Sequence, residues 1–394
     1  MKKITIILSI LIAITVKAYA QWSEPSQVAW NSQNIYCLLS DGSNIFAGTG
    51  SAGVSLSTNN GNSWSAVNNG LTSTGISSFA INGTNVFAGG DGVFLSSNNG
   101  SLWSSVINGL SNTTVNALAI SGSNIFAGTN GGVFLSTNNG GLWSPANTGF
   151  TGQIRSLAIS GTNIFAAAPN HGVYLSTNNG GLWSLINNGL TNIDAVSLAI
   201  SGSNIFVGTS GGVFLTTNNG MLWSAVNNGL TNLNVYSLFV NGSTIYAGTD
   251  DGVFYSNNMG VNWSSFNNGF PANTAVQAFT TSGAFIFAGI RLSPYGVWRR
   301  PLSDVPSGII DKYKNNSFIL YPNPASDFVT LYIDNGINTD FTLNIYNVIG
   351  TLVKTVTLNQ NNRQINIADL CNGVYIVSLG TIHLNTIQKL IIHR

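Results

Sequence analysis

The sequence predicts an all-β protein: a seven-bladed β-propeller with four-stranded blades of about 40 residues each, followed by a small Ig-like β-sandwich. Three observations lead to this prediction. One octet recurs at a fixed period, a second strand-like pattern recurs once more often, and the composition changes near residue 305. Self-similarity at such a period is typical of architectures in which each repeat is one structural unit.

The octet has the pattern Ser/Thr-x-Asn-x-Gly-x-x-Trp and occurs six times at intervals of 39 or 40 residues. We expect its Asn to bond backbone amides across a turn, and its Gly to supply a positive φ. We expect the Trp to pack between neighbouring blades. The six structural-repeat tryptophans are Trp64, Trp103, Trp143, Trp183, Trp223 and Trp263.

A second pattern, Asn44-Ile-Phe-Ala-Gly48 and its variants, occurs seven times, so the number of units is seven. In the third unit we expect four short strands separated by Gly- and Asn-rich turns, at residues 115–120, 124–127, 132–136 and 142–145. The seventh unit lacks the octet and has Gly296–Pro301 in place of the third strand. No stretch of the chain after residue 20 keeps a helical apolar period over a dozen residues.

The seventh unit also has no fourth strand of its own. Trp22-Ser-Glu-Pro25 resembles Trp143-Ser-Pro-Ala146, which leads into a fourth strand. We therefore predict that residues 21–25 complete the seventh blade and leave no blade with an exposed edge. An open solenoid is the alternative, but it would require polar capping repeats, which the sequence does not show.

The first 20 residues have the pattern of a signal peptide. Lys2 and Lys3 precede the apolar stretch 4–16, and Ala18-Tyr-Ala20 is a typical cleavage site. The apolar stretch is too short to cross a bilayer. We predict Sec-dependent export with cleavage near Ala20 and no membrane-spanning segment. The protein would then be secreted, extracellular or attached to the outer-membrane surface.

Composition excludes some partners. Only 6% of the residues are charged, and without the lysines of the first 20 residues the chain has 10 basic and 12 acidic groups, a net charge of −2. With no basic patch to hold phosphates, we expect no nucleic-acid partner. The two cysteines, Cys37 and Cys371, are expected to be buried small hydrophobic residues and to form no disulfide.

The domain boundary follows from the lysines, none of which lies between residues 21 and 305. We predict a propeller over residues 21–305, a linker over residues 306–317, and a separate C-terminal domain over residues 318–394. Alternating apolar strands in the last segment indicate a small antiparallel sandwich.

The octet resembles the Asp-box, or BNR, repeat of sialidase-like and sortilin-like propellers, with Asn in all six copies where that family most often has Asp. The resemblance implies a structural role for the octet, on the face opposite the family's ligand site.

The last 75 residues or so resemble the type A sorting domain of the Bacteroidetes type IX secretion system. The motifs are Tyr321-Pro-Asn-Pro-Ala-Ser-Asp327, Leu343–Gly350, Asn372–Val377 and Lys389–Ile392. This resemblance implies recognition of residues 318–394 by the secretion machinery, then removal of the domain with release or surface attachment. An Ig-like accessory domain that stays attached is the alternative.

Catalytic chemistry is not expected. A sialidase needs an arginine triad and a Tyr/Glu pair, yet Glu24 is the only glutamate of the chain. Most other glycosidases need two carboxylates in one cleft. Nor do the scattered histidines His171, His383 and His393 suit a metal. We predict no catalytic residue, no metal and no cofactor. A glycoside hydrolase of sialidase-like or xyloglucanase-like fold remains the alternative.

The charged residues of the repeats gather in the loops between second and third strands and in those that enter a first strand, which open on one face of a propeller. Loops solvate charge in any protein, so this distribution need not mark a site. The sharper hypothesis is a polar ligand site at the centre of that face, with the residues Asp250, Asp251, Arg291, Tyr295 and His171. The function expected is binding or adhesion, with a glycan or another surface polymer as partner. A purely structural surface component is a further alternative.

Overall fold

The computed structural model describes residues 21–23, 33–150, 152–305, 318–333, 341–347, 350–358, 363–381 and 384–394. The expected signal peptide (1–20) and linker (306–317) lie outside these residues. The chain divides into two compact units, Met1–Gly308 and Ile309–Arg394, and each is described by itself.

The first unit contains repeated four-stranded antiparallel sheets, as the sequence predicts. Strands that follow each other in sequence are neighbours in each sheet. The first three sheets contain β1 (Ile35–Asp41), β2 (Asn44–Thr49), β3 (Val54–Ser57) and β4 (Ser65–Ala66); β5 (Ile76–Asn82), β6 (Asn85–Gly90), β7 (Gly92–Ser96) and β8 (Ser104–Ser105); and β9 (Val115–Ser121), β10 (Asn124–Thr129), β11 (Gly132–Ser136) and β12 (Ser144–Pro145).

Three more sheets repeat this arrangement, and a last one has three strands. They contain β13 (Ser156–Ser160), β14 (Asn163–Ala168), β15 (Gly172–Ser176) and β16 (Ser184–Leu185); β17 (Ala195–Ser201), β18 (Asn204–Thr209), β19 (Gly212–Thr216) and β20 (Ser224–Ala225); β21 (Val235–Asn241), β22 (Thr244–Thr249), β23 (Gly252–Ser256) and β24 (Ser264–Ser265); and β25 (Ala275–Ser282), β26 (Phe285–Arg291) and β27 (Gly296–Pro301), followed by the 3₁₀ turn η1 (Leu302–Asp304).

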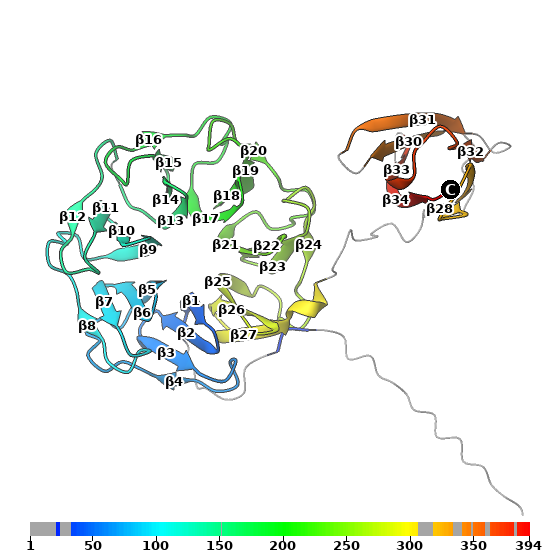
Figure 1. The fold of residues 1–394 in the computed structure, drawn as a ribbon. Coiled ribbons are helices and arrows are strands. Elements are labelled where there is room, and N and C mark those ends of the chain that lie inside the picture. Colours follow the sequence, from blue (N-terminus) through cyan, green and yellow to red (C-terminus); the bar gives the residue numbers. More distant parts are fainter. Residues whose placement is uncertain are drawn as a thin grey trace, which may run out of the picture. The chain divides into compact units, whose positions relative to one another are not determined.

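The sheets stand around a common centre with the first strand of each innermost and the short fourth strand outermost (Figure 1). Each innermost strand packs against that of the next sheet, and β25 packs against β1. The second strands supply much of the core: in β10, the five residues from Ile125 to Thr129 are all buried.

The octet turns share one hydrogen-bond pattern. The first-position Ser or Thr hydroxyl accepts from the amide of the fifth-position Gly at 2.9–3.0 Å. The third-position Asn Oδ1 accepts from the seventh-position amide at 2.9–3.1 Å. The Gly residues have φ of 75–86° as expected, and the fourth position, Asn in five copies and Met259 in the sixth, has φ of 54–57°. Asn adopts this left-handed conformation more easily than most residues do.

The octet tryptophans join neighbouring sheets. In five of them, Trp103, Trp143, Trp183, Trp223 and Trp263, the indole N–H donates to a carbonyl just after the outermost strand of the preceding sheet at 2.6–2.8 Å. These five rings are nearly fully buried, and each keeps a partner for its donor.

Trp22 repeats these contacts without belonging to an octet. Its indole N–H donates to the Phe266 carbonyl at 2.5 Å, and its backbone amide donates to the Asn268 carbonyl at 2.8 Å. The next residue, Ser23, forms an antiparallel bridge with Arg299 of β27, with N–O distances of 3.0 and 3.1 Å. The described N-terminal residues thus pair with the third strand of the last sheet.

The second unit has two antiparallel sheets. One is β28 (Phe318–Tyr321), β29 (Phe328–Ile333) and β32 (Gln364–Asn366), and the other is β31 (Leu352–Leu358), β30 (Phe341–Asn347), β33 (Gly373–Thr381) and β34 (Leu384–Ile392). Buried residues from both, including Leu331, Ile365, Leu343 and Val377, form one apolar core, as in a sandwich.

The two cysteines differ. Both are free, as expected, and Cys37 packs at the edge of an apolar cluster with its thiol donating to the Ile76 carbonyl at 3.6 Å. The expectation that Cys371 is buried was wrong: it is exposed. It lies in the turn before β33, between the buried Leu370 and the strand, where an apolar neighbour in sequence does not imply burial.

Candidate ligand site

Most of the innermost strands contain an extra residue near their start. In six of them the ladder skips one position, a β-bulge, as between Ile35 and Cys37 of β1. Arg155 holds the corresponding position just before β13, where its amide donates to the Ala167 carbonyl at 2.9 Å. We call these residues the bulge ring: Tyr36, Ser77, Asn116, Arg155, Val196, Tyr236 and Gln277.

The bulge ring lines a pocket of about 330 Å³ at the centre of the sheets. The residue before each bulge is an apolar residue that is at most 1% exposed, such as Ile76 or Val235. Burial of this neighbour fixes the strand, and the unpaired bulge residue is left to face the pocket. Further along the strands, Leu118, Leu157, Leu198 and Leu238 also line it.

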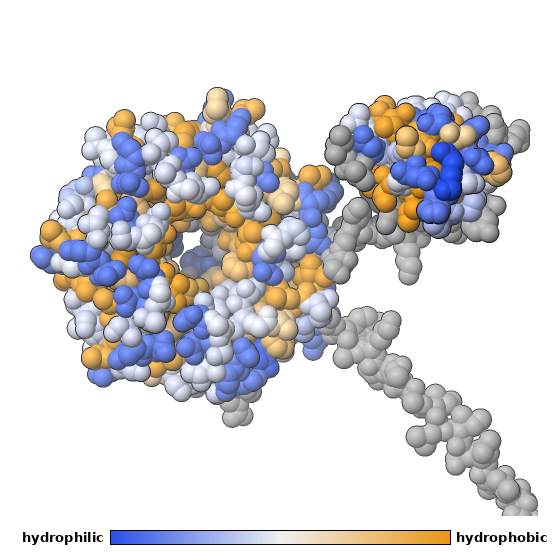
Figure 2. All heavy atoms as spheres, viewed as in Figure 1, coloured by the Kyte–Doolittle hydropathy of each residue, from blue (hydrophilic) through white to orange (hydrophobic). Residues whose placement is uncertain are grey.

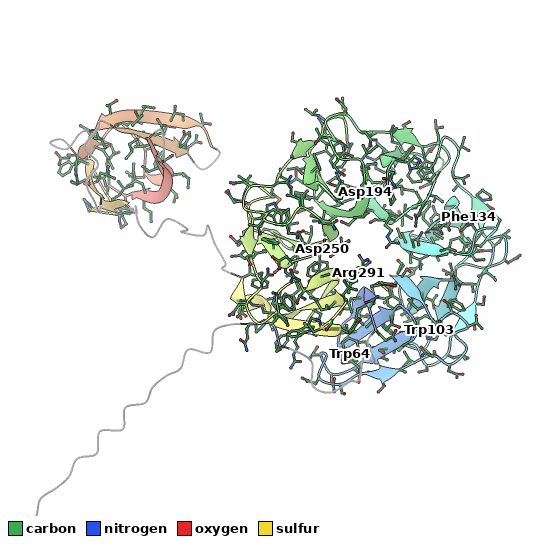
Figure 3. All side chains as sticks on the ribbon, turned by 180° about the vertical axis from the view of Figure 1, so that it is seen from behind. Trp64, Trp103, Phe134, Asp194, Asp250 and Arg291 are labelled. Carbon is green, nitrogen blue, oxygen red and sulfur yellow. The ribbon has the colours of Figure 1, made fainter. Side chains whose placement is uncertain are left out.

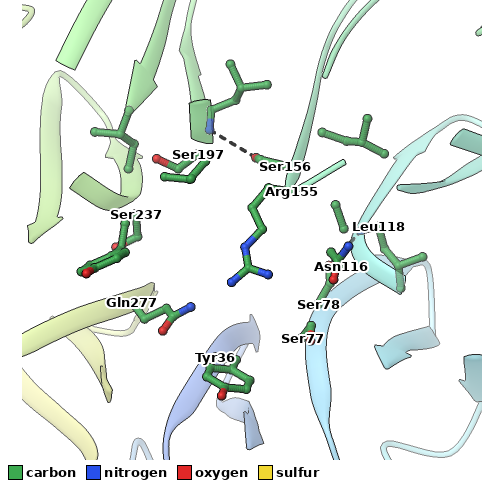
Figure 4. A pocket seen from close by; sticks show the side chains of 16 residues that line it. Tyr36, Ser77, Ser78, Asn116, Leu118, Arg155, Ser156, Ser197, Ser237 and Gln277 are labelled. Atoms are coloured by element: carbon green, nitrogen blue, oxygen red, sulfur yellow. Dashed lines mark hydrogen bonds between the residues drawn. The ribbon is translucent and has the colours of Figure 1, made fainter. Parts of the chain in front are cut away.

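Arg155 is the only charged residue among those that line the pocket. Its side chain extends into the pocket, with Tyr36, Asn116 and Gln277 around it (Figure 4). Within the described part of the chain, its guanidinium forms no hydrogen bond or ion pair. It is solvent-accessible, so its planar set of donors is open to another group.

The polar groups around Arg155 are partly engaged by the backbone. Asn116 donates to the Ile154 carbonyl at 3.0 Å and to Asn130 Oδ1 at 2.9 Å. The Ser78 and Ser156 hydroxyls accept from the amides of Leu118 and Leu198 at 2.9 and 3.2 Å. Each hydroxyl retains its own proton for a second hydrogen bond.

Gln277 differs from these residues, because its Oε1 is buried and has no hydrogen-bond partner among the described residues. A buried acceptor without a partner is unfavourable and uncommon. Gln277 thus lines the pocket with its side chain, while its Oε1 is turned away from solvent.

Two of the predicted site residues lie beside the pocket. Asp250 follows β22, and its Oδ2 accepts from Asn234 at 2.6 Å; the same amide donates to the Tyr236 hydroxyl at 2.8 Å. Arg291, at the end of β26, lies 5.1 Å from the centre of the Tyr236 ring. Figure 3 shows Asp250 and Arg291 on neighbouring sheets. Burial, and then the adjacent Asp250, raise the pKa of Tyr236, so its hydroxyl stays protonated.

The other three predicted residues lie elsewhere. The Asp251 carboxylate accepts from the backbone amide of Asn273 at 3.4 Å, in the loop that leads to β25 of the next sheet. Tyr295 packs against the apolar cluster that contains Ile35 and Trp64. The exposed His171 has its Nδ1 2.9 Å from the Pro169 carbonyl oxygen. None of the three lines the pocket.

The bulge ring was missed because no single copy of the repeat distinguishes it. Comparison of the seven copies would have found it. The position between a constant buried aliphatic residue and a constant small residue varies in chemistry, from Arg155 to Val196 to Tyr236. A variable position between constant ones is the signal.

Figure 2 shows a central hollow with hydrophobic side chains around it on the face drawn. In the described ranges, no group of three His, Cys, Asp or Glu residues is placed to hold a metal ion, and no helix is long and apolar enough to cross a membrane.

Comparison with known proteins identifies the second unit. Residues 319–393 match the family described as the secretion system C-terminal sorting domain. No curated protein shows a significant sequence match to the chain.

The chain resembles solved structures in fold alone. The extracellular domain of a proposed one component system from B. thetaiotaomicron has a TM-score of 0.59 at 12% identity, over 95% of this chain and 59% of that one. A GH74 enzyme of Niastella koreensis has a TM-score of 0.55 at 16% identity, over 71% of this chain and 44% of that one. The chain therefore spans less than two thirds of either structure.

A third structure identifies the architecture. The WD40 β-propeller domain of Doa1 has a TM-score of 0.55 at 14% identity, over 72% of this chain and 96% of that domain. The chain thus consists of a β-propeller-like unit followed by a type IX secretion sorting domain, which implies export from the cell.

Proposed function

We propose that this chain is a secreted or cell-surface binding protein of the adhesion or carbohydrate-binding type, which holds its ligand in the pocket of the bulge ring. The observation that carries the proposal is Arg155, a cation without a partner in a central pocket to which every sheet contributes. Central pockets with a few convergent polar groups are common ligand sites.

The proposal includes a closed seven-bladed ring that begins with Trp22 and Ser23. Its support is the packing of β25 against β1 and the bridge between Ser23 and Arg299. The Ser282 hydroxyl also donates to the Gly42 carbonyl at 2.8 Å, which joins the last sheet to the first. A closed ring would hold the bulge ring rigidly around one axis and leave no free sheet edge.

We also propose that the octets are Asp-box repeats with Asn in place of Asp. In support of this, Asn138 Oδ1 accepts the same kind of backbone bond that a carboxylate would accept. For the second unit we propose an Ig-like sandwich, given its two sheets around one core.

A glycoside hydrolase is the second candidate function, suggested by the similarity in fold to the GH74 enzyme. We favour binding without catalysis because none of the described residues that line the pocket is acidic, and glycosidases generally need two facing carboxylates. Release of reducing sugar from a substrate that the protein binds, lost on Asp250→Asn, would support the hydrolase instead.

The test uses the chain from Gln21 onward on a glycan and surface-polymer array, and in a pull-down with isolated cell surfaces. We expect retention on at least one polymer, and loss of retention when Arg155 is replaced by Gln. The triple variant Asp250→Asn, Asp251→Asn, Arg291→Gln tests the outer-loop site: if it alone abolishes retention, the ligand lies there. Retention on nothing would favour a purely structural surface component.

The export route is tested separately by deletion of residues 319–393, the segment that matches the sorting domain. We expect the truncated protein to remain inside the cell envelope, whereas the full chain reaches the supernatant or the outer-membrane surface. Fractionation of both would also distinguish release from attachment.

A further inference from the structure

We propose that the pocket binds the carboxylate of an acidic sugar residue, a hexuronate, through Arg155. This inference rests on the binding function proposed above and names the ligand class. The juxtaposition that carries it is an unpaired guanidinium beside amide, hydroxyl and tyrosine side chains in one pocket of about 330 Å³.

The charge of the pocket points to an anion. Arg155 has no carboxylate within the pocket to neutralise it, and the nearby Asp250 accepts from Asn234 at 2.6 Å instead. A guanidinium binds a carboxylate through two parallel N–H···O bonds, a geometry that the planar donor set favours. The complementary acceptor must therefore come from the ligand.

The other lining groups suit a sugar ring that carries this carboxylate. Ser78 and Ser156 retain hydroxyl protons that ring oxygens or hydroxyls of the ligand can accept. The Gln277 side chain lies beside Arg155 in the pocket wall (Figure 4), and its amide N–H groups can donate to oxygens of the sugar. Tyr36 also lines the pocket and offers an aromatic ring on which the C–H face of a pyranose can pack (Figure 4).

The size of the pocket restricts the ligand to a small group. Its volume of about 330 Å³ lies at the lower end of the range of small-molecule sites, roughly 300–1,000 Å³. One sugar residue at the end of a chain fits such a volume. A bare inorganic anion would leave the hydroxyl and amide groups of the wall without partners.

The experiment is titration calorimetry of the chain from Gln21 onward with galacturonic acid and with digalacturonate, and with galactose as the neutral counterpart of the same ring. We expect binding of both acids and at least tenfold weaker binding of galactose. Arg155→Gln should weaken the binding of both acids by about tenfold to 100-fold, because hydrogen bonds to charged groups contribute about 1.5–3 kcal/mol. Arg155→Lys should be intermediate.

The control is Lys354→Gln, which removes one positive charge from the exposed Lys354–Asp369 pair of the other unit and should leave the affinity unchanged. Because the Arg155 guanidinium forms no hydrogen bond or ion pair among the described residues and its side chain is exposed, both Arg155 variants should unfold at the wild-type temperature. The salt dependence of binding gives a second readout. We expect the affinity for the acids to rise at low salt in the wild type and this rise to be absent in Arg155→Gln.

Several outcomes would overturn the inference. These are equal binding of galactose, unchanged affinity in Arg155→Gln, inorganic phosphate binding as tightly as galacturonate, or tighter binding of a peptide through its C-terminal carboxylate. If the array shows retention of a polymer that Arg155→Gln does not affect, the acidic-sugar site fails while the binding function survives. If no ligand or polymer is retained, both fail.

Discussion

Cys37 and Tyr246 are ionisable side chains in apolar surroundings. Burial raises the pKa of the Cys37 thiol above its usual range, although the Gly48 backbone opposes the shift. Burial also raises the pKa of Tyr246 to about 12, from 10.0. In both cases the loss of hydration of the charged form outweighs the neighbouring groups that would stabilise it. These groups therefore act as neutral packing residues at ordinary pH.

Because of Tyr246, the free energy of unfolding should depend on pH in the alkaline range. Since the folded chain holds this proton more tightly than the unfolded chain, its contribution is present below pH 10 and is lost as pH rises to about 12. A shift of this size corresponds to about 2–3 kcal/mol. We expect Tyr246→Phe to flatten the fall in the free energy of unfolding over this window, as measured by urea titration. An equally steep fall of the free energy of unfolding in the wild type and in Tyr246→Phe would contradict the assignment of this pH dependence to Tyr246.

The two thiols should react at different rates. At pH 7–8 we expect a maleimide to modify the exposed Cys371 within minutes, and Cys37 only after unfolding, because its thiolate is scarce and its sulfur is packed. Mass spectrometry of tryptic fragments measures both. Cys37→Ser is the matched control, since Ser237 at the equivalent position donates to the Val276 carbonyl at 3.3 Å. Equal labelling of Cys37 and Cys371 in the folded chain would refute the expected difference in reactivity.

The sequence predicted the residues whose role is local and missed those whose role depends on the pairing register between strands. The octet Asn and Gly could be assigned because their bonds close within a few residues, as in Asn138 with Leu142. Arg155 could not be placed in the pocket, because a bulge is a matter of pairing with the next strand. Asp250 and Arg291 were expected together and do flank Tyr236, but His171 lies on a different sheet.

The octet turn is the element that the chain repeats most faithfully. In each copy one Asn side chain and one hydroxyl replace backbone partners that a strand ladder would have supplied. The turn delivers Trp143 to the neighbouring sheet, since the Trp143 amide donates to the Asn108 carbonyl at 2.8 Å. This bond to another sheet explains why β12 begins at Ser144, two residues later than the strand expected from residue 142.

Substitution of the octet Asn tests this account. Asn138→Ala removes the acceptor for the Leu142 amide and should lower the free energy of unfolding by about 1 kcal/mol. Asn138→Asp keeps the acceptor and should cost less, as the Asp-box proposal requires. Denaturant titration of the two variants gives the comparison. A larger loss in the free energy of unfolding with Asn138→Asp than with Asn138→Ala would contradict the proposal that Asn stands in for the Asp of an Asp-box.

For the molecule as a whole, the two ends of the first unit meet at the same sheet. Arg300 is buried, pairs with Asp304 at 3.0 Å and donates to the Phe266 carbonyl at 3.0 Å, which also accepts from Trp22. The repeats could be counted from sequence because their period is regular. The pairing of the N-terminal residues with the three-stranded last sheet could be predicted only by comparing distant segments of the sequence, here those around Trp22 and Trp143.

Loss of Trp22 should therefore destabilise the whole ring. Its side chain is 1% exposed, and Trp22→Ala should lower the free energy of unfolding by about 3–5 kcal/mol, as large-to-small core substitutions do. Trp223→Ala is the control, because that ring makes the same kind of bond inside an octet. Similar losses, measured by denaturant titration, are expected. A loss below about 1 kcal/mol for Trp22→Ala alone would argue against closure.

The bulge ring also has an evolutionary consequence. Each of its members follows a buried aliphatic residue that holds the strand, and in the strand ladder the bulge residue itself pairs with nothing. A substitution there changes the chemistry of the pocket wall with little effect on the packing between sheets. With the proposed binding function, seven such positions, each encoded in a different copy of the repeat, would allow lineages to acquire new ligand preferences one codon at a time while selection on stability leaves the scaffold unchanged.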